Sequence, residues 1–291
     1  MKIRILVAVL MFVVFIKPVH AVQSTITESD GTACMGDDKS RRQTEQAALT
    51  DAKKKAVEFT STYIRNETEV KNFVVEKDLL AAYANAEIKI IQELEKSWFK
   101  DASLGDCCKT RIKAEVVPDV KAMEKLSKNA EFRDDPSAPL KVKAWTDKKE
   151  YKTGEKVKIY IKANKPFYAR VLYKDAGGEI IQLLPNPFRT ENYFNGGSIY
   201  EIPAGNDKFD LEVSPPFGEE NVMVYASTTP LGEIGVETRG GVYQVKTRTR
   251  DIGLKTRGVK PMERTEGKAS ASVNQSASEF FEDNVVVKTG K

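Results

Sequence analysis

Apolar and polar positions along the chain follow two different periods, and the first is helical. The stretch SRRQ from Ser40 to Gln43 has the S-x-x-Q spacing of a capping box, which marks the start of a helix. From Thr44 to Ile64 small and apolar residues recur at intervals of three and four, so this segment is predicted to be one long helix. Its predicted buried stripe consists of Ala48, Ala52, Ala56, Phe59 and Tyr63.

Strict alternation of apolar and charged residues follows, which is typical of half-buried strands. Ile88, Ile90, Leu94 and Trp98 alternate with charged residues, and a turn at Leu104–Asp106 leads to a second alternating run from Cys107 to Val116. These runs predict an antiparallel hairpin. A first strand over residues 22–36, a loop or weak strand over 66–77, and helices at 78–85 and 118–129 complete an α+β domain over residues 22–129, in which the long helix packs on a three-stranded sheet.

The second part of the chain reads as strands throughout. Residues 130–138 are polar, contain Pro136 and are followed by Pro139, which predicts a linker. Seven or so short alternating segments follow within residues 139–231, and they predict an all-β, immunoglobulin-like sandwich. Its strands are expected at 142–146, 157–163, 167–173, 179–184, 198–202, 209–214 and 221–227. Residues 232–291 are predicted to be an irregular basic and Ser-rich extension, disordered over 267–278, with a returning strand at Val285–Val287.

The first residues have the pattern of a secretory signal peptide. Lys2 and Arg4 precede an apolar run from Ile5 to Ile16, which is shorter than the roughly 20 residues that span a bilayer. Cleavage is expected after Ala21, and an uncleaved anchor is the alternative. We therefore expect an exported chain without a membrane span after cleavage, most simply periplasmic, with secretion or outer-membrane association as alternatives.

Processing would remove residues 1–21 and with them the only histidine, His20. The formal charge would fall from +4 to +1, because Lys2, Arg4 and Lys17 leave with that segment. A chain without histidine has no Ser-His-Asp or Cys-His centre and lacks the commonest zinc ligand. We therefore expect no enzyme, no cofactor, no metal and no nucleic-acid partner.

Three cysteines in an exported chain suggest one disulfide and one free thiol. Cys34 ends the first predicted strand and Cys107 begins the last strand of the domain, so antiparallel pairing of these strands would bring the two together. Cys108 points to the apolar face, where a buried free cysteine is common. The favoured disulfide is Cys34–Cys107, Cys34–Cys108 is its rival, and a redox-active Cys107–Cys108 pair is a third interpretation.

The stretch LLPNPFRTENYFNGG from Leu183 to Gly197 is the strongest candidate for a binding loop. Two prolines and several turn-forming residues exclude a helix and make a regular strand unfavourable, so a crossover between the two sheets is predicted. That task does not explain the aromatic residues. In this loop aromatic rings would stack on a sugar while asparagines hydrogen-bond to it, or they would contact a protein partner; the candidates are Asn186, Phe188, Asn192, Tyr193, Phe194 and Asn195.

Other candidate sites are less specific. Lys246, Arg248 and Arg250 would share one strand face, where an anionic envelope polymer would bind, although a solvated edge strand is the simpler interpretation. Asp134 and Asp135 are adjacent carboxylates in the linker, and adjacent residues seldom converge on one substrate. The sequence has no D-x-D-x-D-G calcium loop.

Short motifs in the second part resemble the bacterial domain-of-unknown-function 4384 family over residues 139–231. They include Tyr151-x-x-Gly154-Glu155-x-Val157, Gly177-Gly178-x-Ile180, Leu184-Pro-Asn186, Ile202-Pro203 and Pro216-x-Gly218. The resemblance implies a β-sandwich module of an exported protein with an accessory role and no catalytic residues. Residues 24–129 resemble more weakly the amino-terminal domain of flagellar assembly protein T, through the alanines of the long helix and Ile112-x-Ala114-x-Val116.

The sequence therefore favours a non-enzymatic envelope protein that binds or assembles with another envelope protein. A glycan or small-ligand sensor that uses the 185–197 loop is the alternative.

Overall fold

One continuous sheet, antiparallel except where β5 (Glu150–Lys152) pairs in parallel with the last strand, β14 (Ala277–Gly290), runs through most of the molecule. The computed structural model describes residues 21–67, 73–128, 134–205, 207–258 and 276–291, and side chains 73–76 are not included. Residues 1–20 of the predicted signal peptide (1–21) lie outside the described residues. The N-terminal elements are β1 (Val22–Cys34), α1 (Arg41–Glu67), α2 (Phe73–Ala84), β2 (Glu87–Asp101), β3 (Gly105–Val117) and α3 (Val120–Leu126).

The remaining elements are mainly strands. They are β4 (Val142–Thr146), β5 (Glu150–Lys152), β6 (Ile159–Ala163), β7 (Phe167–Lys174), β8 (Ile180–Leu184), β9 (Tyr193–Phe194), β10 (Ile199–Ile202) and β11 (Glu219–Ser227). After them come β12 (Val236–Arg239), β13 (Val242–Val245), α5 (Thr249–Thr256) and β14 (Ala277–Gly290). The mixed α/β class with a β-sandwich part is thereby confirmed.

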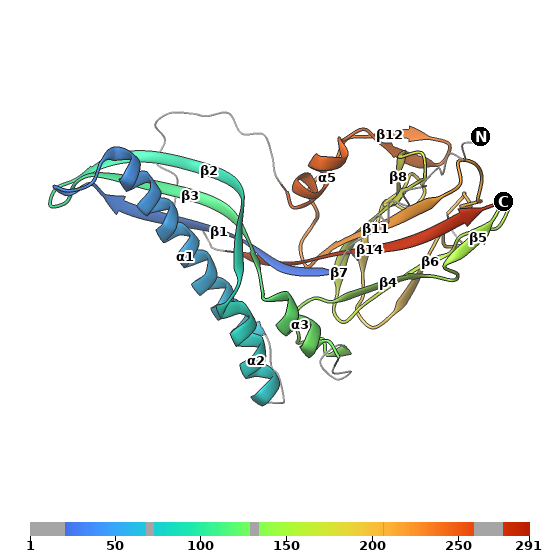
Figure 1. The fold of residues 1–291 in the computed structure, drawn as a ribbon, viewed down its shortest axis with the longest axis horizontal. Helices are drawn as coiled ribbons and strands as arrows, with labels where there is room; N and C mark the ends of the chain where they lie inside the picture. Colours follow the sequence, from blue (N-terminus) through green and yellow to red (C-terminus); the bar gives the residue numbers. More distant parts are fainter. Residues whose placement is uncertain (1–20, 68–72, 129–133, 206, 259–275) are drawn as a thin grey trace, which may run out of the picture.

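The last strand, β14, joins the two parts of the chain. The large sheet has eleven strands in the order β12-β13-β8-β7-β11-β14-β1-β3-β2, with β5 on β14 and β9 on β7 (Figure 1). The first half of β14 pairs with β1, from Val22 opposite Glu282 to Thr27 opposite Ala277. Phe280 to Lys288 of β14 pair with β11 on the other side. The three strands predicted for the N-terminal part therefore continue directly into the sandwich.

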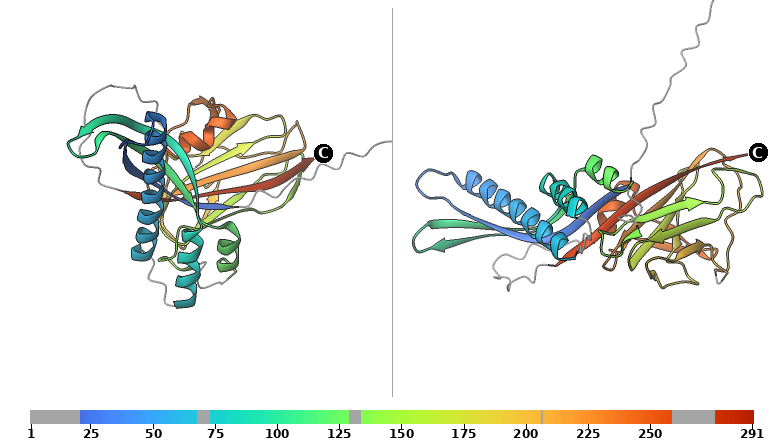
Figure 2. Two further views of the ribbon diagram at one scale, coloured as in Figure 1. Left: turned by 60° about the vertical axis from the view of Figure 1, so that its left-hand side comes forward. Right: turned by 90° about the horizontal axis from the view of Figure 1, so that it is seen from below.

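The second sheet, β10-β6-β4, faces the sandwich part of the large sheet. Alternation along β6 explains the arrangement, because Ile159, Ile161 and Ala163 are buried between the sheets while the residues between them are not. The arm formed by β1, β3 and β2, with α1 along it, extends away from this sandwich (Figure 2).

Several expectations need correction in detail. Residues 73–77 belong to α2 rather than to a loop or weak strand. No strand forms over the described residues 209–214, where Glu212 makes only an isolated bridge with Lys156. Residues 232–291 are more regular than predicted, because 236–245 form a hairpin, 249–256 a helix and 277–290 a long strand. The predicted disorder over 267–278 lies mostly outside the described residues, but 277 and 278 belong to β14.

Small residues set the distance between α1 and the sheet. The buried stripe of α1 repeats every four residues as Thr44, Ala48, Ala52, Ala56, Thr60 and Ile64. Phe59 and Tyr63, which were predicted to belong to this stripe, are half-buried at its border. Gly31 of β1 lies against the helix so closely that a Cβ there would come within 2.2 Å of the Ala48 carbonyl oxygen. Among the described helices, none combines the length and apolar character needed to cross a bilayer.

This contact generates a stability prediction. Replacing Gly31 by Ala forces α1 away from β1, and we expect the free energy of unfolding to fall by about 3 kcal/mol. The matched control is Gly290→Ala in β14, where an added Cβ meets nothing within 4 Å. Urea denaturation followed by circular dichroism measures both variants. Equal stability of the two variants would contradict the close packing of α1 on β1.

Candidate functional site

The 185–197 loop connects the two sheets of the sandwich. It leaves the large sheet at the end of β8, where Leu184 lies opposite Val171, and enters the second sheet at β10. On the way, Phe194 pairs with Phe167 and Tyr193 with Tyr168, so that β9 adds two residues to the edge of β7. The predicted crossover is therefore confirmed by the strand order.

Asn186 is a structural residue of this loop. It is fully buried, and its side-chain oxygen accepts hydrogen bonds of 2.8 Å from the backbone N–H groups of Phe188 and Arg189. Its amide group donates to the Leu183 carbonyl at 3.0 Å and to the Asp207 carboxylate at 2.9 Å. All of these partners belong to the protein, so Asn186 holds the turn closed and is not accessible to a ligand.

Asp207 is a second centre of the loop, and sequence reasoning missed it. Its carboxylate also accepts a 2.7 Å hydrogen bond from the Ala204 N–H and lies 3.3 Å from the Arg189 guanidinium. Burial lowers the pKa of Arg189, and the nearby Asp207 carboxylate opposes this effect. The 185–189 segment is thus fixed to the turn that follows β10. The sequence PAGND, which ends at Asp207, predicts a turn, but it does not predict that Asp207 contacts Asn186 and Arg189.

The three aromatic residues of the loop have different environments. Phe194 is buried in the sandwich core between Phe167 and Tyr200. Phe188 is 43% exposed, with its ring against Gly241 and the Lys208 ammonium 5.6 Å from the ring centroid. Tyr193 is 53% exposed and its ring lies 5.0 Å from that of Tyr168.

The remaining asparagines contribute through their main chain. The Asn192 carbonyl accepts a 2.8 Å hydrogen bond from Ala169, and the Asn195 N–H donates to the Tyr200 hydroxyl at 3.0 Å. Of the six candidate residues, Phe188 and Tyr193 therefore present accessible aromatic surface. Asn195, two positions after Tyr193, is exposed as well.

The role of Asn186 can be tested by substitution. Asn186→Ala leaves two buried N–H groups without an acceptor, so we expect the free energy of unfolding to fall by about 3 kcal/mol. Asn195→Ala is the matched control and should stay within about 0.5 kcal/mol of the wild type. Chemical denaturation measures both, and a neutral Asn186→Ala would show that the loop does not depend on this residue.

A second candidate surface lies at the tip of the arm and was not predicted. Here β2 is the end strand of the large sheet, and Phe99 near its end and Leu104 in the following turn are exposed large apolar residues. Ile90 is also exposed, but it lies near the start of β2, opposite Ala114. A cavity of about 280 Å³ lies here and is lined by Met35, Arg41, Trp98, Phe99, Lys100 and Asp106. The Arg41 guanidinium lies 4.5 Å from the centroid of the Trp98 ring.

The disulfide closes the arm next to this surface. Cys34 and Cys107 lie opposite each other in the β1–β3 pair and are bonded, which confirms the favoured pairing over Cys34–Cys108. Cys108 is buried and free, and burial raises the pKa of its thiol. A raised pKa disfavours the reactive thiolate, which argues against a redox-active Cys107–Cys108 pair.

Loss of the disulfide should weaken the arm. The bond closes a loop between positions 73 apart in sequence, for which chain entropy predicts a contribution of about 4 kcal/mol. We expect Cys34→Ser/Cys107→Ser to unfold at a lower temperature than the wild type, and dithiothreitol to lower the midpoint of the wild type only. Calorimetry with and without reductant measures this difference. A wild type that is insensitive to reductant would contradict it.

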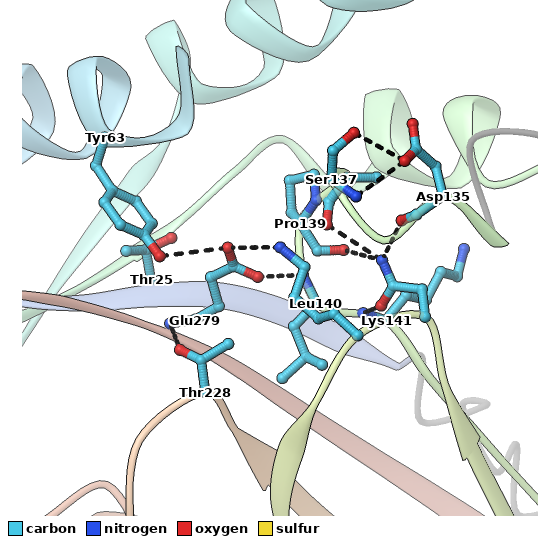
Figure 3. A network of polar contacts seen from close by, with 12 residues as sticks. Thr25, Tyr63, Asp135, Ser137, Pro139, Leu140, Lys141, Thr228 and Glu279 are labelled. Atoms are coloured by element: carbon cyan, nitrogen blue, oxygen red, sulfur yellow. Dashed lines mark hydrogen bonds and ion pairs between the residues drawn. The ribbon is translucent and has the colours of Figure 1, made fainter. Parts of the chain in front are cut away.

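At the junction of arm and sandwich, the buried carboxylate of Glu279 in β14 has several partners (Figure 3). It accepts hydrogen bonds from the Leu140 N–H and, at 3.5 Å, from the Tyr63 hydroxyl, and it pairs with the Lys165 ammonium at 3.1 Å. Burial raises the pKa of the Tyr63 hydroxyl, and the charge of Glu279 adds to this shift. With each oxygen occupied by the protein, this carboxylate has the environment of a structural residue.

Asn164 fixes the predicted linker at the same place. Its amide donates to the carbonyl groups of Asp135, Ala138 and Pro139, and its oxygen accepts from the Lys141 N–H at 2.8 Å (Figure 3). Asp135 receives hydrogen bonds from Ser137, and Asp134 lies 3.5 Å from Lys162. The described part of the linker is therefore bound to the sandwich, and its two aspartates do not converge on one point.

The opposite face of the sheet is closed by Arg257, which follows α5. Its guanidinium contacts the carboxylates of Glu115 at 2.9 Å and Glu282 at 2.8 Å and lies 4.4 Å from the Phe280 ring centroid. Burial by itself lowers the pKa of Arg257, but the two carboxylates outweigh it and leave the pKa raised. The guanidinium thus stays charged and joins α5, β3 and β14.

Two further cavities flank the sheet. One of 440 Å³ lies beside α5 and is lined by residues that include Glu28, Lys113, Thr229 and Arg257. One of 310 Å³ lies at the far end of the sandwich and contains the carboxylates of Asp175, Glu179, Asp210, Glu212 and Glu220. Within the described residues, no group of three or more His, Cys, Asp or Glu side chains is placed to hold a metal ion.

The basic stretch near residue 246 differs from its prediction. β13 ends at Val245 and α5 begins at Thr249, so Lys246, Arg248 and Arg250 do not share one strand face. Each has an acidic neighbour: Lys246 pairs with Glu237, and both arginines pair with Asp251.

The fold defines a protein with a β-sandwich and a disulfide-closed arm, and comparison with known families adds one finding. Residues 150–230 match the family model of the domain of unknown function DUF4384, within the range where the resemblance was expected. The matched segment runs from β5 to a point just beyond β11, whereas the sandwich also uses β4 and β14. Neither the curated proteins nor the solved structures contain a match to the chain.

Proposed function

We propose that this chain is a non-enzymatic, exported envelope protein that binds another envelope protein through the tip of its arm. The observation that carries the proposal is the apolar surface at the end of β2 and in its turn, where Phe99, the neighbour of Cys107 in the β2–β3 pair, and Leu104 are exposed close to the disulfide. An exposed apolar group beside an unpaired strand edge is typical of a partner surface, because the edge offers backbone hydrogen bonds and the apolar group offers contact area.

The form of β2 supports this assignment. Its register shifts between Ile90 and Gln92 and again between Glu93 and Glu95, so bulges interrupt the middle of the strand. The segment from Glu95 to Asp101 is regular, and its outer edge has no strand partner among the described residues. An extended segment of a partner protein would add to this edge and place an apolar side chain beside Phe99.

Further parts of the proposal rest on the sequence. The signal peptide and the disulfide are both in keeping with export to the periplasm, because structural disulfides persist in oxidising compartments. The immunoglobulin-like character of the sandwich and the likeness of the arm to the amino-terminal domain of flagellar assembly protein T belong to the same proposal. Both would suit an accessory or assembly role.

Site-specific photocrosslinking in living cells tests the partner surface. With a photoreactive amino acid in place of Phe99, we expect one reproducible crosslinked band whose second component is a protein of the envelope. The matched position is Val236 on β12, an exposed apolar residue at the opposite end of the sheet, where no such band should form.

The binding energy should depend on the same surface. Phe99→Lys should reduce co-purification of the crosslinked partner at least tenfold, which corresponds to about 1.4 kcal/mol. Circular dichroism confirms that the variant is folded. Crosslinks from both positions alike, or from neither, would overturn the proposal.

Glycan binding by the 185–197 loop is the second candidate, favoured by the exposure of Tyr193 beside Tyr168 and of Phe188 beside Lys208. Under this hypothesis a glycan array shows binding that Tyr193→Ala abolishes and Asn195→Ala weakens. Phe99→Lys leaves glycan binding unchanged, which separates the two hypotheses. An array without signal above background would exclude the sensor.

A further inference from the structure

The outward face of the β10-β6-β4 sheet combines lysines with aromatic side chains. On the inner side of β6, Ile159 and Ile161 are buried in the sandwich core. On the outer side, Tyr160 and Lys162 alternate with them and remain partly exposed. We name this surface the lysine face and define it by Lys143, Trp145, Lys158, Tyr160, Lys162 and Ile199.

Basic residues are concentrated in this part of the chain. Residues 141–165, which contain β4, β5 and β6, hold nine lysines and three acidic residues, although the chain as a whole has a formal charge of only +4. Such an imbalance creates a local positive potential that does not follow from the net charge. Three of these lysines, Lys143, Lys158 and Lys162, belong to the lysine face, whereas Lys148, Lys156 and Lys165 are paired with carboxylates elsewhere.

Two of the lysines oppose each other directly. Lys143 of β4 and Lys162 of β6 are cross-strand partners, and like charges in this position destabilise a sheet. Lys162 is 3.5 Å from Asp134, whereas the contact found for the exposed Lys143 is the Trp145 ring, 5.2 Å from its ammonium. An external anion would relieve the repulsion that the fold itself leaves between these two ammonium groups.

The face is not uniformly charged. Lys158 is paired with Glu201 at 2.7 Å and also donates to the Pro203 carbonyl, so it adds little free charge. This leaves Lys143, and Lys162 with its longer contact to Asp134, as the cations that an external group would meet first.

Apolar and amphipathic side chains surround these lysines. Trp145 and Tyr160 lie opposite each other with their rings stacked, the centroids 5.6 Å apart. Ile199, which lies opposite Lys162 on the other side, is 61% exposed, the largest value among the exposed large apolar side chains of the described residues. Tryptophan, tyrosine, lysine and an exposed aliphatic residue together are the side chains that proteins place at a membrane–water interface.

From these observations we propose that the lysine face adsorbs to an anionic phospholipid surface. Its negative headgroups would neutralise Lys143 and Lys162, while Ile199 and the Trp145 ring would enter the headgroup layer. A flat partner fits better than a polymer chain, because the three cavities described above do not involve the residues of this face. The proposal concerns a surface other than the arm tip and does not depend on the proposed function.

The chain provides its own fluorescent reporter for the test. It contains two tryptophans, so Trp98→Phe leaves Trp145 on the lysine face as the only one, and Trp145→Phe leaves Trp98 on the arm. With vesicles of phosphatidylglycerol and phosphatidylcholine, we expect the emission of Trp145 to shift to the blue. The shift should disappear in 0.5 M salt, because the Debye length falls from about 10 Å at 0.1 M to roughly 4 Å there. The emission of Trp98 should not change.

Charge variants distinguish binding through the lysine face from a general attraction between the whole protein and anionic vesicles. Lys143→Glu/Lys162→Glu, made in the Trp98→Phe background, should weaken vesicle binding at least tenfold. The control Lys53→Glu/Lys54→Glu on α1 removes the same charge and should change binding less than twofold. Vesicles of phosphatidylcholine alone control for the apolar residues 5–16, whose attraction to lipid does not require negative headgroups.

Three results would overturn the proposal. The first is no blue shift of Trp145 with phosphatidylglycerol, and the second is an equal loss of binding in the two charge variants. The third is a Trp145 response to dextran sulfate in solution without a response to vesicles, which would assign the face to a soluble anionic polymer instead.

Discussion

The structure depends on one strand. β14 is hydrogen-bonded to β1 on one side and to β11 on the other, so the last residues of the chain lie between its first strand and the sandwich. Without β14, β1 and β11 would each expose a buried edge, and unpaired backbone groups inside a fold are costly. The arm and the sandwich therefore share one hydrogen-bonded ladder, even though their sequences read as two separate domains.

Side chains of β14 turn this ladder into a fixed junction. Because successive residues of a strand point to opposite faces, Glu279 reaches Tyr63, Leu140 and Lys165 on one face, while Phe280 and Glu282 meet Arg257 on the other. Both faces contain a buried charge with an opposite partner, an arrangement whose main effect is to specify one geometry, since the desolvation cost offsets much of the attraction. The angle between arm and sandwich is thus set by paired charges on both sides of one strand.

Local patterns in the sequence were sufficient for much of this fold, and the failures have a common cause. Alternation predicted β2, β3, β4, β6, β7 and β8, and the position of Cys34 and Cys107 at two strand ends predicted the disulfide. In contrast, the sequence predicted only Val285–Val287 of β14 as a strand. The pairing of Val22 with Glu282 joins residues far apart in sequence, so a local pattern of apolar and polar residues cannot predict it. The long-range partners of a strand decide whether a polar segment such as SEFFEDN is ordered.

The candidate loop shows the same limit at the level of single residues. The sequence marked Asn186, Phe188, Tyr193 and Phe194 as one group, yet the fold buries Asn186 and Phe194 and exposes the other two. Asn186 is buried because Asp207 and Arg189 complete its hydrogen bonds, and that arrangement required a contact across 21 positions of sequence. Composition identifies a segment rich in binding-type side chains, whereas only the pairing of polar groups decides which of them stay accessible.

Since the sheet is continuous, its accessible surfaces have fixed positions relative to one another. Phe99 and Leu104 lie on the arm beyond β1 and β3, while the lysine face belongs to the second sheet of the sandwich. If a protein binds at the arm tip and a lipid surface binds at the lysine face, the sheet shared by both halves would hold them apart. The ion pairs of Glu279 and Arg257 at the junction would resist a change in the angle between the halves. Under the two proposals, the shared sheet would fix the separation of the two bound partners.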